Sequence, residues 1–294
     1  MQSDEIFARI QSEAICAIDL QFTDVAGIIK TVTIDADQLK TALHQGIWFD
    51  GSAVEGVARI AESDMYLLPD LNTFAVLPWE TAAAGSGQTA RIICDVYTPN
   101  GQPFAGDPRG ALRRALQQAQ ERGLTYFIAP ELEFYLFRKR PKADTAPAPD
   151  DTASYFDAAD GVAHTIRKRV SAALRSMGIG VLSSHHEVGG GQHEIDLAPT
   201  DALSMADAII TARQTVRTIA AQEDRFATFM PKPITDAPGN GMHVHQWLAD
   251  RETGVNRFTD TAHDYGLSAE AQHFMAGQLQ HAREMCLVLA PLVN

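Results

Sequence analysis

The sequence has few cysteines, few basic residues and no apolar run near the ~20 residues that cross a bilayer. Its three cysteines, Cys16, Cys94 and Cys286, lie far apart and match neither a disulfide framework nor a zinc-ligand spacing. The N-terminus carries acidic residues and lacks the apolar core of a signal peptide. We therefore predict a cytoplasmic protein in a reducing compartment, without a membrane partner.

Positive charge is also scarce. The chain has 24 Lys and Arg against 37 Asp and Glu, which gives a formal net charge of −13 at pH 7. Such a surface repels nucleic acid and anionic membranes, so neither is expected as the main partner. A phosphate-bearing substrate then has to be bound through metal ions or through a local cluster of arginines.

The first part of the chain is rich in strand patterns. Its 294 residues leave room for a large core and two domains. Residues 3–14 are typical of a helix, and residues 14–35 alternate like a hairpin that turns at Asp24–Gly27. Strand-like runs follow at 73–79 and 90–98, so we predict a β-rich domain over residues 1–103.

The second part, residues 104–294, adds long helical patterns. Asp107 and Pro108 are typical of a helix start, and Gly123 of its end. The 3.6-residue periodicity predicts further helices over 163–178, 200–224 and 267–291, the last capped by Ser268. The Pro- and Ala-rich residues 138–156 are predicted to form an exposed loop. The fold class is therefore α+β.

Two pairs of glutamates are the main candidates for functional residues. Glu131 and Glu133 lie in FIAPELEFYLF, whose β-formers predict a strand on which residues two apart share a face. Glu187 and Glu194 flank three glycines in SHHEVGGGQHEID, and a hairpin turning at these glycines places the two glutamates opposite each other. Like charges so placed repel unless a cation lies between them.

A histidine pair, His243 and His245, follows in GNGMHVHQW. Carboxylate oxygens with one imidazole suit Mg²⁺ or Mn²⁺ better than Zn²⁺, which prefers thiolate and imidazole. The alternative is that each pair is a solvated strand face. The apolar residues around Glu131 and Glu133 favour a half-buried strand, and clustered carboxylates favour a metal site.

Five motifs resemble those of the glutamine synthetase family, class I of bacteria and archaea. They are FDGSAVEGVARIAESDMYLLPD (49–70), APELEFYLF (129–137), SHHEVGGGQHEID (184–196), FMPKPITDAPGNGMHVHQ (229–246) and the final APLVN. The resemblance implies a β-grasp domain followed by a catalytic domain with a curved antiparallel sheet and flanking helices. It also implies rings, usually dodecamers of two hexamers, whose active sites are shared between neighbouring subunits.

The resemblance also implies residue roles. One cation would be bound by Glu133, Glu187 and Glu194, and a second by Glu131 and His243 with a further glutamate. His245 would lie near the nucleotide phosphates and Gly239 in the loop that meets the substrate glutamate. Asp50 would reach into the neighbouring subunit's site to bind and deprotonate ammonium. His185 and His186 are expected in supporting rather than ligating positions.

The implied reaction forms γ-glutamyl phosphate from ATP and glutamate, and ammonia then attacks it to give glutamine. Departures from the family pattern leave two alternatives open. Ala53 replaces the second serine of FDGSS, which hints at a γ-glutamyl-amine ligase for polyamines or other organic amines. The chain also ends before the family's arginine-bearing segment, which leads to the expectation of a non-catalytic fragment or ring subunit. Leu182, Trp247 and Pro238 differ from the family pattern as well.

Overall fold

The computed structural model describes residues 3–54, 64–80, 87–142, 147–158 and 161–290. The chain forms two compact units whose segments interleave. Unit 1 comprises Met1–Ala115, Val170–Ile179 and Ala206–Thr215, and unit 2 comprises Leu116–Arg169, Gly180–Met205 and Val216–Asn294. The predicted division between residues 103 and 104 stays a prediction. Among the described helices, none has both the length and the apolar character required to cross a bilayer.

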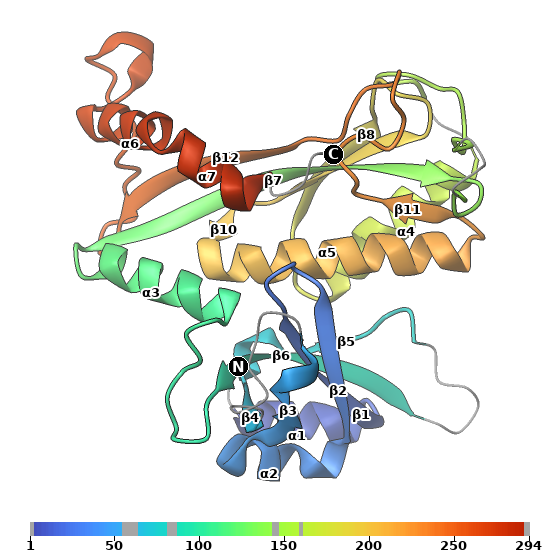
Figure 1. Ribbon diagram of the computed structural model, residues 1–294, viewed down its shortest axis with the longest axis vertical. Helices are drawn as coiled ribbons and strands as arrows, with labels where there is room; N and C mark the ends of the chain where they lie inside the picture. Colours follow the sequence, from blue (N-terminus) through green and yellow to red (C-terminus); the bar gives the residue numbers. More distant parts are fainter. Residues whose placement is uncertain (1–2, 55–63, 81–86, 143–146, 159–160, 291–294) are drawn as a thin grey trace. The chain divides into compact units, whose positions relative to one another are not determined.

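Unit 1 is built on a mixed sheet with the order β2-β1-β6-β4-β3, and β5 pairs with β6 (Figure 1). The central pair, β1 and β6, is parallel, and the other pairs are antiparallel. Its elements are α1 (Ser3–Ser12), β1 (Ile15–Thr23), β2 (Ile29–Asp35), α2 (Leu39–Gln45), β3 (Ile47–Asp50), β4 (Asp64–Pro69), β5 (Ala75–Val76) and β6 (Gln88–Tyr97).

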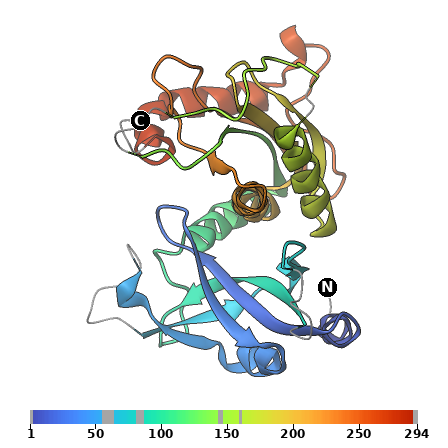
Figure 2. The same cartoon turned by 90° about the vertical axis from the view of Figure 1, so that its right-hand side faces the viewer.

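The predicted hairpin is confirmed, and its turn has a local cause. The Asp24 carboxylate accepts hydrogen bonds from the amides of Ala26 and Ile28, at 3.0 and 2.9 Å, and Gly27 has a φ of +71°, which favours glycine. The apolar side of the sheet meets α1 and α2 (Figure 2). Ile6 and Leu39, one from each helix, are fully buried in this core.

The predicted strand at 73–79 is mostly wrong, because only Ala75–Val76 pairs as β5. The Asp70 carboxylate accepts the Asn72 amide at 3.2 Å, and the Thr73 amide bonds to the Asp70 carbonyl at 3.0 Å. These bonds form a 3₁₀ turn over Leu71–Thr73 in place of extended chain. This turn reaches only Thr73, and at the other end of the run the Glu80 amide bonds to the Leu77 carbonyl at 3.3 Å, so a turn at each end limits the extended chain.

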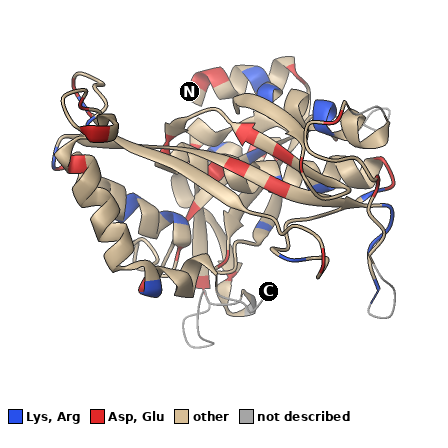
Figure 3. Ribbon diagram, turned by 90° about the horizontal axis from the view of Figure 1, so that it is seen from above, with Lys and Arg blue, Asp and Glu red and all other residues tan. Residues whose placement is uncertain are grey.

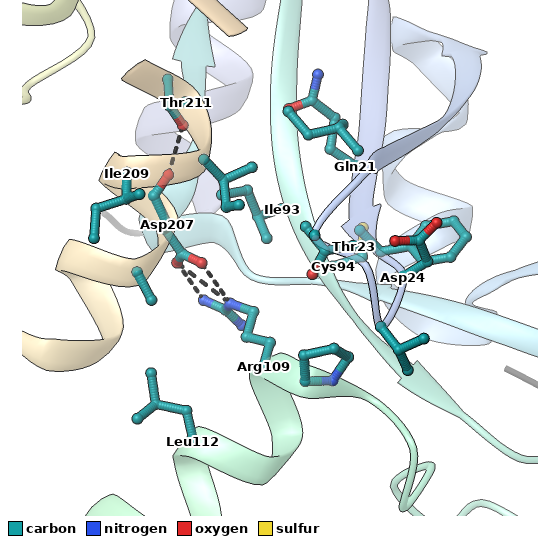
Figure 4. Close-up of a pocket in the computed structure, with 17 residues that line it drawn as sticks. Gln21, Thr23, Asp24, Ile93, Cys94, Arg109, Leu112, Asp207, Ile209 and Thr211 are labelled. Atoms are coloured by element: carbon teal, nitrogen blue, oxygen red, sulfur yellow. Dashed lines mark hydrogen bonds and ion pairs between the residues drawn. The ribbon is translucent and has the colours of Figure 1, made fainter. Parts of the chain in front are cut away.

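Unit 1 also holds a cavity of about 310 Å³ between the β1–β2 turn, β6 and two helical segments (Figure 4). Arg109 lies on its wall beside apolar side chains such as Ile93 and Leu112. The helical segments come from α3 (Pro108–Gln120) and α5 (Ala202–Gln222). The Arg109 guanidinium pairs with Asp207 at 2.9 Å, which places a buried ion pair at the cavity wall.

Unit 2 is built on an antiparallel sheet centred on the long strand β7 (Leu124–Phe137). One edge of β7 pairs with β9 and β10, the other with β11 and β12, and β8 continues the sheet beyond β9. The remaining strands are β8 (Val181–His186), β9 (Gln192–Leu197), β10 (Thr200–Asp201), β11 (Phe226–Thr228) and β12 (Met242–Asp250). The remaining helices are α4 (Val162–Ser176), α6 (Ala269–Gln280) and α7 (Ala282–Leu289).

The predicted helices are confirmed in position, with one correction. Asp201 caps α5 by accepting the amides of Leu203 and Ser204, and Ser268 caps α6 by accepting the Ala271 amide. The pattern at 267–291 was expected to form one helix. It forms α6 and α7, because the backbone of His281 (φ −103°, ψ 9°) leaves the helical conformation.

The stretch 138–156 is only partly the predicted exposed loop. Its second half folds back on β7, where the Asp150 amide bonds to the Leu136 carbonyl at 2.9 Å. The Asp150 carboxylate forms an ion pair with Arg225 and is almost fully buried. The described residues of this segment are otherwise exposed or half-buried, with Tyr155 and Phe156 exposed, so backbone and ion-pair contacts fix the segment on β7 without burying it.

Candidate metal centre

Acidic residues lie next to one another on neighbouring strands of the unit 2 sheet (Figure 3). Glu131 and Glu133 share a face of β7, as predicted, while Leu132 and Phe134 between and beside them are buried on the other face. Glu194 of β9 lies directly opposite Glu133, and His243 of β12 lies directly opposite Glu131. Direct opposition in an antiparallel pair puts both side chains on the same face.

The hairpin between β8 and β9 has a different register from the one predicted. His185, not Glu187, pairs with Glu194, and the Glu187 amide bonds to the Gln192 carbonyl at 2.8 Å. The turn therefore consists of residues 188–191 and is not centred on the three glycines. Because the shift is two residues, Glu187 keeps its face and becomes a diagonal neighbour of Glu194.

Both histidines of the GNGMHVHQW motif contact one carboxylate. His243 Nδ1 lies 2.8 Å from Glu131 Oε2, and His245 Nε2 lies 2.7 Å from Glu131 Oε1. These hydrogen bonds, from His245 first and then from His243, lower the pKa of Glu131. The same bond to Glu131 raises the pKa of His243. Glu131 and His243 are therefore adjacent, as a shared ligand role requires.

Glu194 has the most perturbed carboxyl of this face. Its side chain is buried, and burial followed by the neighbouring carboxylate of Asp196 raises its pKa to about 8, with Glu187 and Glu131 adding to the effect. Oδ1 of Asp196 is also buried and has no hydrogen-bond partner among the described residues. Buried like charges of this kind favour either a bound proton or a bound cation.

Gly239 is brought to the same face by a glutamine that the sequence analysis missed. Gln192 Nε2 donates to Glu133 Oε2 and to the Gly239 carbonyl, each at 2.9 Å. The loop is further fixed by the Tyr135 hydroxyl, which donates to the Pro238 carbonyl at 2.7 Å. Gln192 lies two residues before Glu194 on one strand, so the two-residue period could have identified it.

Asp196 was missed in the same way, and it lies opposite Glu131 on β9. Ligand-type atoms of His185, Glu194 and Asp196 lie within 4.8 Å of one another, so His185 is closer to a ligating position than predicted. His185 Nε2 also lies 3.0 Å from Glu187 Oε1. Asp50 belongs to unit 1, where its carboxylate accepts the amide and hydroxyl of Ser52 at 2.9 and 2.6 Å.

The turn beside Glu187 depends on Gly191. Its φ is +71°, and an added Cβ would lie 2.8 Å from the Leu136 carbonyl oxygen and 3.0 Å from the Asp150 nitrogen. We expect Gly191→Ala to cost the left-handed penalty of about 1–2 kcal/mol plus the displacement of two backbone atoms. Urea unfolding measures the sum.

Gly254→Ala is the matched control for Gly191→Ala. Gly254 has a φ of +70°, but nothing lies within 4 Å of its added Cβ, so only the conformational penalty applies. Equal losses of unfolding free energy in the two variants would show that the backbone contacts at Gly191 do not matter.

Comparisons with known proteins agree with this geometry. The family model described as glutamine synthetase, beta-Grasp domain, matches residues 14–99, and the one described as glutamine synthetase, catalytic domain, matches residues 105–294. Two similar curated proteins are named glutamine synthetase. One, from Halobacterium salinarum, is 46% identical over 286 residues, covering 97% of this chain and 62% of the relative. The other, from Thermus thermophilus, is 43% identical over 292 residues, covering 99% and 65%.

A solved structure supports the fold. The cryo-EM structure of Plasmodium falciparum glutamine synthetase superposes with a TM-score of 0.88 at 24% identity, covering 98% of this chain and 61% of that one. The chain thus spans less than two thirds of the length of these relatives. The expected combination of a β-grasp domain and a catalytic domain with an antiparallel sheet is confirmed. By both family models, this chain belongs to the glutamine synthetase family.

Proposed function

We propose that the protein to which this chain belongs is a glutamate–ammonia ligase that uses ATP and forms glutamine through γ-glutamyl phosphate. The observation that carries the proposal is the single sheet face on which Glu131, Glu133, Glu194 and His243 meet. Family membership gives the face its chemical context. The relatives named above are glutamine synthetases, which favours ammonia over an organic amine as the second substrate.

We infer that Mg²⁺ or Mn²⁺ binds this face. Oxygen ligands predominate, the buried carboxyl of Glu194 is surrounded by other carboxylates, and a buried oxygen of Asp196 has no described partner. These features fit a hard divalent cation. Glu133, Glu187 and Glu194 would ligate one ion, and Glu131 with His243 part of a second. When bound, such ions neutralise the ATP phosphates and align the γ-phosphoryl group with the glutamate carboxylate.

The protein's own groups orient these ligands. The Gln192 amide holds Glu133, and its second acceptor, the Gly239 carbonyl, fixes the loop proposed to meet the substrate glutamate. The Val188 amide donates to Glu187 Oε2 at 3.0 Å, so the Glu187 carboxylate is held from the turn side. His245 is proposed to lie near the nucleotide phosphates, and Asp50 to bind and deprotonate ammonium in a neighbouring subunit. Assembly into rings and a cytoplasmic location likewise stay proposals.

The activity is tested by phosphate release from ATP. The native protein is assayed with glutamate plus ammonia, and in parallel with glutamate plus putrescine or ethylamine. We expect turnover with ammonia. A clear preference for an organic amine would replace the ammonia ligase with a γ-glutamyl-amine ligase, and no glutamate-dependent turnover with any amine would refute the ligase class.

Metal binding is tested on the chain itself. We expect Mg²⁺ or Mn²⁺ to raise the melting temperature, because a ligand bound only by the native state stabilises it by RT ln(1 + [L]/Kd). The gain should vanish in Glu187→Ala, which removes one ligand of the first ion. His243→Ala should keep most of the gain, because that side chain belongs to the second ion. Calorimetry with and without metal measures both, and an equal gain in Glu187→Ala and wild type would refute the ligand role.

A further inference from the structure

A polar network packs against residues 188–191, the turn that follows Glu187 and is called the Glu187 turn below. This network is not part of the proposed ligand set. It consists of Asp151, His186, His193 and Arg167, and the side chains of His186 and His193 are almost fully buried. His186 Nδ1 donates to the Glu187 carbonyl at 2.6 Å, and His186 Nε2 lies 2.8 Å from Asp151 Oδ1. Arg167 Nη1 lies 2.7 Å from His193 Nδ1.

One interpretation of this network is a separate metal site, because ligand-type atoms of Asp151, His186 and His193 lie within 4.8 Å of one another. Arg167 argues against that interpretation. Its guanidinium can only donate, so His193 Nδ1 accepts and the proton of the neutral ring lies on Nε2. His193 therefore offers no free lone pair, and a fixed positive charge lies beside it. Without His193, only Asp151 and His186 remain as possible ligands of an ion here, and these two side chains already contact each other.

The segment 151–156 wraps the Glu187 turn through several hydrogen bonds. Asp151 Oδ1 accepts the Gly191 amide at 2.9 Å, at one end of the turn, and contacts His186 at the other. The Ser154 hydroxyl donates to the Val188 carbonyl at 3.3 Å. The Phe156 amide donates to the His186 carbonyl at 3.1 Å.

The segment has a strained backbone at its end. Phe156 has a φ of +60°, a left-handed conformation that is unfavourable for a bulky residue. This conformation accompanies the Phe156 bond to His186 and the packing of the Phe156 ring on His185, with centroids 4.8 Å apart. A strained residue persists only where surrounding contacts fix it, so the segment is held firmly against the turn.

We propose that residues 151–156 form a clamp that sets the position of the Glu187 carboxylate for cation binding, with Asp151 and His186 as its positioning residues. The clamp rests on the proposed metal function of Glu187. Asp151 contacts both ends of the turn, through the Gly191 amide and through His186. His186 in turn donates to the Glu187 carbonyl, which fixes the main chain of Glu187. Groups that orient metal ligands in this way change metal affinity without touching the ion.

The clamp is tested by Mn²⁺ affinity in the full chain, from the electron paramagnetic resonance signal of free Mn²⁺. We expect Asp151→Ala to weaken Mn²⁺ binding about 10–100-fold, the usual effect of losing an outer partner of a ligand. Asp151→Asn should fall between Asp151→Ala and wild type, because its amide oxygen can still accept the Gly191 amide. Wild-type affinity in Asp151→Ala would overturn the proposal.

The adjacent Asp150 supplies the matched control. Asp150→Asn breaks the buried ion pair with Arg225 and destabilises the same segment, but it leaves the bonds to the turn in place. Its Mn²⁺ affinity should stay near wild type at a temperature where all variants are folded. Equal weakening by Asp150→Asn and Asp151→Ala would reduce Asp151 to general structural support and overturn the proposal.

Hydrogen exchange in the presence of a chelator separates the clamp from the metal function. Amides of residues 188–192 should exchange faster in Asp151→Ala than in wild type, whereas those of β12 should not change. If wild type bound no Mn²⁺, the metal function would fail, and the claim that the clamp serves cation binding would fail with it. Unchanged exchange at the turn would overturn the clamp even where Mn²⁺ binds.

Discussion

Replacing Glu194 with glutamine is expected to make the metal-free protein more stable than wild type at pH 8 and to abolish its stabilisation by divalent cations. Burial and the carboxylate of Asp196 raise the pKa of Glu194 to about 8 from an unperturbed value of 4.5. The native state therefore retains a proton that the unfolded chain releases. Native wild type is stabilised by this proton below about pH 4.5 and loses that stabilisation as pH rises toward 8.

The slope of the unfolding free energy against pH gives the size of this effect. Where only the native state is protonated at this site, the free energy of unfolding falls by at most about 1.4 kcal/mol per pH unit. Glutamine resembles the protonated acid in shape and carries no charge, so Glu194→Gln should lack this contribution. Urea unfolding in EDTA across this pH range measures the difference between variant and wild type.

Two controls accompany the Glu194 experiment. Glu252→Gln removes an exposed carboxylate and should leave the pH dependence of wild type unchanged. A cation has to displace the Glu194 proton, so the metal-dependent gain in wild type should grow with pH up to about 8 and stay absent in Glu194→Gln. If the unfolding free energies of wild type and Glu194→Gln changed equally with pH, the result would contradict a buried, protonated Glu194 in the native state.

Replacing Arg109 with methionine is expected to cause the largest loss of stability among the variants considered. The Arg109 side chain is 7% exposed, and its guanidinium pairs with Asp70 at 2.8 Å, with Asp95 at 2.5 Å and with Asp207 at 2.9 Å. These carboxylates come from a turn, a strand and a helix that are distant in sequence. Methionine keeps most of the volume but leaves three partly buried carboxylates without this cation, which costs about 3–5 kcal/mol.

Arg113→Met is the matched control, because Arg113 contacts two of the same carboxylates. Its side chain is 41% exposed and lies 2.7 Å from Asp70 and 3.2 Å from Asp95. An exposed ion pair contributes about 0–1 kcal/mol, so the loss should be much smaller. Urea unfolding at pH 7 compares the losses of unfolding free energy in the two variants. Equal losses would show that burial of the guanidinium is not the cause.

Local sequence determined much of the secondary structure of this protein. Asp24 and Gly27 specify the first hairpin, and Asp201 and Ser268 cap two long helices, because these effects act within a few residues. The alternation around Glu131 and Glu133 likewise predicted a shared face. The predicted strand at 73–79 was mostly wrong because two local turns, one after Asp70 and one after Leu77, were not recognised.

Only the tertiary structure decided how these local pieces combine into a site. The register that pairs Glu194 with Glu133 and His185 depends on three strands meeting, and a period of two residues does not distinguish registers that differ by two. The hydrogen bond from Gln192 to Glu133 and the contact of Asp151 with His186 each link residues far apart in the chain. The raised pKa of Glu194 likewise depends on burial and on nearby carboxylates, including one from another strand. Burial and long-range hydrogen bonds arise only when these segments pack together. The sequence therefore identified the candidate residues of the site, but it did not determine their pKa values or their hydrogen-bond partners.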